Sequence, residues 1–196
     1  MSTLKQTPSQ TVGPFFAYGL CPGQYHYDLG NLFSPEAATH HASGEHITII
    51  GKVYDGSGAA VGDAVIETLQ PDAKGNYVTS VEQARESGFR GFARVGTGTD
   101  PEQRFVIRTI KPGAVNADAA PCLDVIVLMR GMLLHTFTRI YFDDEPQANA
   151  RDDVLRQVPP ERRSTLIARR DLHASSPVYR FDIHMQGPQE TVFFDL

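Results

Sequence analysis

The sequence predicts an all-β protein, an antiparallel β-sandwich or a related barrel with few short helices. Short runs rich in β-branched residues recur along the chain, and clusters of Gly, Pro and Asp separate them. Helix signals are scarce by comparison. Near the C-terminus, residues 179–186 alternate between apolar and polar side chains, which indicates a strand with one buried and one exposed face.

The N-terminal part of the chain differs from the rest. Residues 1–45 contain repeated Pro and Gly and no sustained period, so we expect an extended arm with turns and a short helix at Pro35–Ala38. Irregular segments of this length are uncommon in a compact isolated domain, so we expect the arm to pack on a partner chain. Residues 46–196 then form the β-sandwich, and the chain is a single domain overall.

The strands follow from the apolar, β-branched runs between turn sequences. They are expected at His46–Val53, Ala64–Leu69, Arg104–Ile110, Val125–Met129 and Thr136–Phe142, before the alternating segment. A short surface helix is expected at Pro160–Ala168, because Pro suits the first turn of a helix. The Gly-rich stretch at Gly96–Asp100 is interpreted as a loop, since no Lys or helix follows it in the manner of a phosphate-binding loop.

Composition narrows the function classes. The chain has 196 residues, 41% hydrophobic and 21% charged, with a net charge of −5, which disfavours binding to nucleic acid. No apolar window approaches the roughly 18 residues of a membrane span, and Val12–Ala17 is too short for a secretory signal. Cys21 and Cys122 could form one disulfide, but two reduced thiols in a cytoplasmic protein is the favoured interpretation.

Several stretches carry a family resemblance. The most specific are Thr7–Pro14, Ile50–Gly56, Lys111–Gly113, Leu134–Asn149 and Glu190–Leu196. Together they resemble the intradiol ring-cleavage dioxygenases. Some members of this family are built from two kinds of chain, alpha and beta, and the resemblance is to the alpha chain. The implied fold is a β-sandwich of the intradiol dioxygenase type.

The resemblance also implies that this chain holds no metal. Family members bind ferric iron through two tyrosines and two histidines, and the matching positions here are Tyr77, Val115, Cys122 and Asp124. Of these four positions, only Tyr77 keeps the residue type that binds iron in the family, and the side chain of Val115 cannot bind a metal. The resemblance therefore implies that Fe(III) is bound by the partner beta chain.

The resemblance assigns a substrate-binding role to a few residues of this chain and a catalytic role to none. They are Arg130, Thr11, Gly13, Pro14 and Phe15. A guanidinium can stabilise the negative charge of an aromatic diolate or carboxylate. Gly permits close backbone approach, and Pro stiffens a segment. Without the resemblance, however, Arg130 would be interpreted as a solvated arginine, and the Gly13-Pro14 pair would be interpreted as a turn.

The implied activity belongs to the hetero-oligomer. An (alpha-beta)n assembly would oxidise 3,4-dihydroxybenzoate with O2 to 3-carboxy-cis,cis-muconate, in the β-ketoadipate pathway of aromatic degradation. The missing ligands and the long arm suggest an obligate interface of more than about 2,000 Å². No nucleic acid or membrane partner is expected.

Three alternatives remain open. The chain could be a structural or regulatory homologue that contributes to no pocket, or a β-sandwich binding module that acts alone. It could also be an iron-independent enzyme that uses Tyr77 or the pair Cys122 and Asp124. Asp182 and His184 share a strand face, but that face is the polar one, so solvation is the favoured interpretation.

Overall fold

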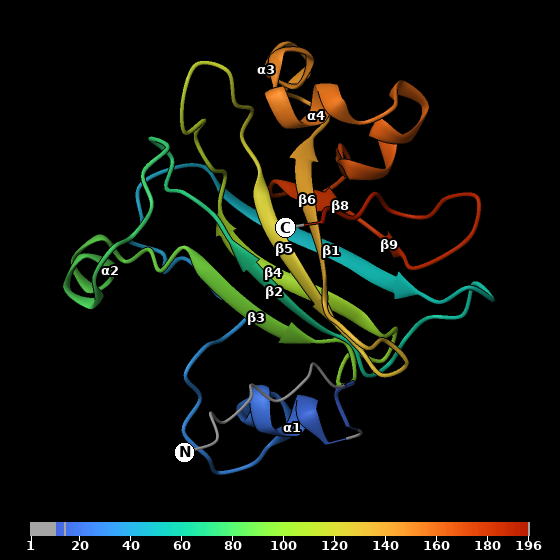
Figure 1. Cartoon of the computed structure of the whole chain (residues 1–196). Coiled ribbons are helices and arrows are strands. Elements are labelled where there is room, and N and C mark those ends of the chain that lie inside the picture. The colour runs from blue at the N-terminus through green and yellow to red at the C-terminus, as the bar shows by residue number, and fades with distance from the viewer. Residues whose placement is uncertain (1–10, 14, 196) are drawn as a thin grey trace, which may run out of the picture.

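The computed structural model describes residues 11–13 and 15–195, and β-strands dominate its architecture (Figure 1). The strands are β1 (His46–Tyr54), β2 (Val65–Leu69), β3 (Phe92–Gly96), β4 (Arg104–Ile110), β5 (Leu123–Leu128), β6 (Thr136–Phe142), β7 (Ile167–Arg170), β8 (Val178–Arg180) and β9 (Ile183–His184). Their order is β3-β2-β5-β6-β7-β8-β1-β4, with β9 paired to β1. The end strands β3 and β4 also contact each other, so the sheet curls into a nearly closed, barrel-like sandwich.

The pairing is not wholly antiparallel, and this corrects the sequence-based prediction. β1 runs parallel to both β8 and β9, and β6 runs parallel to β7. Parallel neighbours require a long crossover connection. Between β6 and β7 the crossover is made by α3 (Pro146–Arg151), α4 (Asp153–Gln157) and the 3₁₀-helix η2 (Pro160–Leu166). In Figure 1 these helices lie together at one end of the sheet.

The main core lies between the two halves of the curled sheet. β1 alternates between buried and half-buried residues, and Ile49 and Val53 are fully covered. They pack with Phe105 and Leu123 from other strands, and each fully buried side chain of this size contributes about 1.5–3 kcal/mol. Gly51 sits in the middle of β1, where a Cβ atom would collide with the backbone carbonyl of Phe181.

The N-terminal arm is more structured than expected. It contains α1 (Phe16–Leu20) and the 3₁₀-helix η1 (Pro22–Tyr25), and α1 buries Ala17 against Val65 of β2. The helix expected at Pro35–Ala38 is wrong. Backbone hydrogen bonds instead link this stretch to β4, because the amide of Ala37 donates to the carbonyl of Arg108 at 2.9 Å.

Most strand positions were predicted correctly. β4 and β6 have the expected bounds, while β5 begins two residues early, at Leu123. The alternating segment divides into β8 and β9, although Phe181 and Ile183 are buried as expected. The helix expected at Pro160–Ala168 is the 3₁₀-helix η2 followed by a strand. β3 and α2 (Val81–Ser87) were not predicted.

Both cysteines are free, and they belong to different hydrophobic clusters. Within residues 11–13 and 15–195, no helix combines the length and the apolar character that crossing a bilayer would require.

Candidate functional site

Arg130 lies in the turn between β5 and β6, two residues after the end of β5. The turn needs a glycine at the next position, because Gly131 has a φ of 89°. The Nε–H of Arg130 donates to a carboxylate oxygen of Asp63, which precedes β2. The rest of the arginine side chain remains 56% exposed. Asp63 thus holds one side of a guanidinium group on a largely exposed side chain.

The N-terminal segment lies beside this turn. Val12 lines a hollow of about 250 Å³ together with residues that flank Arg130, including Met129, Met132 and Leu134. Thr11 and Gly13 are exposed, and Phe15 is 76% exposed with its ring 6.0 Å from that of Tyr18. The structure therefore brings residues 11–13 to the surface that carries Arg130.

No described atom of the chain would approach a Cβ at Gly13 within 4 Å, so close packing within the chain does not explain this glycine. Pro14 lies outside the described residues. Leu133, at the tip of the same turn, is 76% exposed. The surface around Arg130 is therefore unusually apolar for one in contact with water.

The four positions matched to iron ligands provide no metal site. Burial and the nearby charge of Asp124 raise the pKa of the Tyr77 phenol above its ordinary value. Burial raises the pKa of Cys122 to about 12, so this thiol does not ionise at neutral pH. Val115 is exposed and apolar. Among the described residues, no group of three His, Cys, Asp or Glu side chains could hold an ion.

A cation of the protein itself lies at this position. The Nε–H of Arg139 donates to Asp124 at 2.9 Å, and its terminal nitrogen lies 3.5 Å from the hydroxyl of Tyr141. Burial opposes the guanidinium charge, but the Tyr141 hydroxyl and Asp124 raise its pKa above the ordinary value. A permanent positive charge beside Asp124 would repel a metal ion, so the residues present do not fit iron.

Sequence reasoning missed Arg139 and Asp63. Arg139 directly opposes Asp124 in the antiparallel register of β5 and β6, and this cross-strand pairing was the available signal. Nothing in the sequence linked Asp63 to Arg130, because 67 residues separate them.

Of the other candidates, Asp182 and His184 form no site. Asp182 accepts a hydrogen bond from the amide of Lys52, and the His184 ring stacks on Tyr54 at 4.9 Å between centroids.

Comparisons with known proteins identify relatives of this chain. A family model described as "Dioxygenase" matches residues 31–132, more than half of the chain. The chain is 60% identical to the protocatechuate 3,4-dioxygenase alpha chain of Burkholderia cepacia, over all of both chains. It is 41% identical to the alpha chain of the same name from Pseudomonas putida, over 98% of this chain and 97% of that one. The Burkholderia cepacia beta chain is 30% identical, over 76% of this chain and 67% of that one.

Solved structures share the fold at low sequence identity. An intradiol ring-cleavage dioxygenase from Tetranychus urticae has a TM-score of 0.60 at 15% identity, and the match covers 91% of this chain and 94% of that one. A dioxygenase domain from Streptomyces has a TM-score of 0.61 at 17% identity, covering 95% and 100%. The family match and the full-length relatives therefore establish that this chain belongs to the intradiol ring-cleavage dioxygenase family.

Proposed function

We propose that this chain is the alpha subunit of a protocatechuate 3,4-dioxygenase. Together with an iron-bearing beta chain, it would cleave 3,4-dihydroxybenzoate with O2 to 3-carboxy-cis,cis-muconate. The observation that carries the proposal is a pair of arginines. Arg139 lies where the family binds its metal, and Arg130 is presented at an exposed turn. This arrangement fits a chain that lends groups to a neighbour's pocket and lacks an iron site of its own.

Arg130 is the residue of this chain that we assign to the substrate. Its hydrogen bond to Asp63 restrains the side chain, which reduces the entropy lost when a ligand binds. Its terminal N–H groups have no acceptor among the described residues, so they are available to a carboxylate or diolate. The ferric ion of the partner would supply the chelation of the catechol. We place the backbone of Gly13 and Pro14, with Thr11 and Phe15, along the wall of the same pocket.

The assembly would be an (alpha-beta)n hetero-oligomer of cytoplasmic location. Exposed apolar side chains support a covering partner, since Leu133 in the Arg130 turn and Phe15 in the N-terminal arm both lie mostly in solvent. The two free cysteines are consistent with a reducing compartment.

Kinetics of the reconstituted complex test the role of Arg130. Replacing Arg130 by Ala should lower kcat/KM about 10- to 100-fold, because one charge-assisted contact to an anionic substrate is lost. A rise in KM alone would indicate ground-state binding, whereas a fall in kcat would indicate stabilisation of charge that develops during the reaction. Arg130→Lys should retain part of the activity, and Asp63→Asn should show a smaller loss.

The matched control is Arg151→Ala, an exposed arginine at the end of α3. The iron content of the complex should be unchanged in all four variants. Kinetics of Arg130→Ala equal to those of the unmodified complex would refute the assigned role.

A further inference from the structure

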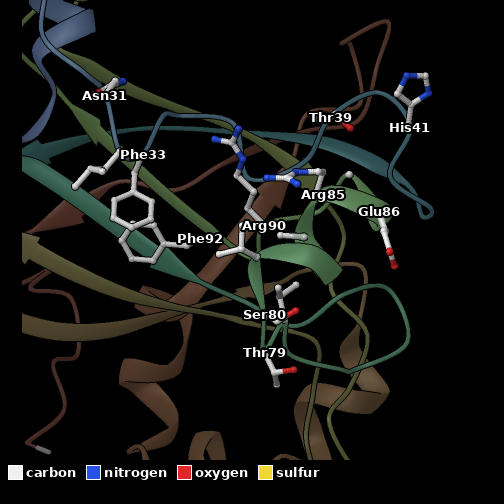
Figure 2. Close-up of a pocket in the computed structure, with 15 residues that line it drawn as sticks. Asn31, Phe33, Thr39, His41, Thr79, Ser80, Arg85, Glu86, Arg90 and Phe92 are labelled. Atoms are coloured by element: carbon white, nitrogen blue, oxygen red, sulfur yellow. The ribbon is translucent and has the colours of Figure 1, made fainter.

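A wide hollow lies between the N-terminal arm, α2 and β3. It has a volume of about 940 Å³ (Figure 2). Its lining includes apolar and basic side chains, namely Leu32, Phe33, Val81 and Phe92 together with Arg85 and Arg90. No residue assigned to the substrate lies in it, and we call it the α2 groove.

Two arginines of the α2 groove lack counter-charges. Arg85 and Arg90 both line the hollow, and neither forms an ion pair with any carboxylate among the described residues. Glu86 lines the same hollow, but its carboxylate points away from both. Neighbouring like charges repel, and an anion between them would relieve this. The patch is also opposite in sign to the net charge of −5.

The rim of the α2 groove is apolar and exposed. Leu32 is 83% exposed on the arm, and Val81 is 68% exposed at the start of α2. Beside them, the rings of Phe33 and Phe92 meet at 4.5 Å between centroids. Arginines within an exposed aliphatic and aromatic surface are typical of protein interfaces rather than of water-facing surfaces.

The α2 groove and Arg130 lie at opposite ends of β2. At one end Leu69 pairs with Phe92, which lines the groove, whereas at the other end Val65 pairs with Leu128, next to the Arg130 turn. The α2 groove and the Arg130 turn are therefore separate parts of the surface.

We propose that the α2 groove docks an acidic segment from a neighbouring alpha-beta pair, with a carboxylate between Arg85 and Arg90 and an apolar side chain against Leu32 and Val81. This inference rests on the proposed function, because it assumes that alpha-beta pairs exist. Charge complementarity selects the carboxylate, and the exposed rim selects a protein segment over a small ion. The contact would join pairs into the larger (alpha-beta)n assembly.

Light scattering of the purified, co-expressed complex tests the proposal. The variant Arg85→Glu with Arg90→Glu should weaken association between pairs at least tenfold, so that the molar mass falls toward that of one pair. Leu32→Asp should act in the same direction through the apolar rim. The matched control, Arg151→Glu, reverses an exposed charge on α3 and should leave the mass unchanged. Thermal unfolding midpoints within about 2 °C of the parent would show that the variants fold.

The possible results are distinguishable. A mass lowered by both groove variants and kept by the control supports the docking role. An unchanged mass in the double variant overturns it, as does an unmodified complex that consists of one pair only. If the chain purifies without an equimolar second chain, the proposed function itself fails.

Discussion

Arg139 makes contacts that a solvated surface arginine would not. Its side chain is 30% exposed and lies between Asp124 and the hydroxyl of Tyr141, which in turn donates to Asp152 at 3.0 Å. Cys122 is close enough for its ionisation to be affected by the arginine. Three of the four positions that resemble iron ligands, Tyr77, Cys122 and Asp124, thus lie close to a positively charged side chain of the protein itself.

Removing this cation should destabilise the fold. In Arg139→Gln, Asp124 loses its charge-assisted hydrogen bond from Arg139, so we expect a loss of about 1–2 kcal/mol in the free energy of unfolding. The control is Arg156→Gln, since Arg156 pairs with Asp153 on an exposed helix face and should cost less than about 0.5 kcal/mol. Denaturant titration measures both, and equal effects would contradict a specific role for the cluster.

The sequence alone indicates a functional role for some of these residues and not for others. Arg130 could be singled out because a strand end, a glycine and the family resemblance coincide there. Arg139 could not, because an arginine within a strand of a β-sandwich is usually on the solvated face. Asp63 acquires its function only through the folding of two distant turns.

At the scale of elements, local signals predicted strands well where the strand buries one face. Thr136–Phe142 and Arg104–Ile110 are of this kind. β3 was missed because it has only five residues and ends in the Gly-rich stretch that reads as a loop. The error at Pro35–Ala38 has another cause, since bridges to Arg108 and Phe89 outweigh the local helix signal.

The capping of α4 shows how an element depends on distant contacts. Asp152 is buried at the N-cap, and its carboxylate accepts hydrogen bonds from the amides of Leu155 at 2.7 Å and Ala120 at 2.8 Å. It also accepts the hydroxyl of Tyr141 from β6. One side chain therefore joins a short helix, a loop and the sheet.

Asp152→Ala should lower the free energy of unfolding by about 3 kcal/mol, because three buried donors lose their acceptor. Asp152→Asn should recover part of this, since an amide oxygen still accepts. Ser80→Ala removes the exposed N-cap of α2 and should cost about 1 kcal/mol. Chemical denaturation compares the three variants. A cost for Asp152→Ala no greater than that of Ser80→Ala would mean that the cap acts only locally.

On the scale of the whole molecule, an ionic network joins β4, β6, β7 and β8. Lys111 lies 3.0 Å from Asp144 and 2.8 Å from Glu145, with its side chain only 13% exposed. Arg170 contacts Asp144 at 3.3 Å, and the hydroxyl of Tyr179 donates to Asp144 at 2.8 Å. The network lies at the strand ends, where the crossover between β6 and β7 begins. Because it consists of ionisable groups, we expect their protonation to affect how the stability of the fold depends on pH.

The directions of the pKa shifts determine the pH range over which this network stabilises the fold. Burial opposes ionisation of Asp144, but hydrogen bonds from Lys111 and Tyr179 hold its pKa below the ordinary 3.8. Its contribution is therefore present above about pH 4 and is lost as the pH falls through the lower folded value. Burial also opposes the charge of Lys111, while Glu145 and Asp144 raise its pKa above 10.5. That contribution is present below pH 10.5 and is lost as the pH rises through the folded value. Burial and Asp144 raise the pKa of Tyr179 to about 12, so its neutral hydroxyl persists throughout the range between these limits.

Lys111→Met should therefore cost about 2 kcal/mol between roughly pH 4 and pH 10.5, and the difference from the unmodified protein should shrink outside this range. In acid the difference shrinks because a protonated Asp144 no longer needs a cation, and in alkali because the unmodified protein loses its own ammonium charge. The matched control is Lys74→Met, an exposed lysine in the turn before Tyr77, and its stability curve should run parallel to the parent curve. Urea unfolding at a series of pH values measures all three curves. A constant difference for Lys111→Met from pH 3 to pH 11 would mean that the lysine acts by packing on Phe142 and Tyr179 and that its charge contributes little.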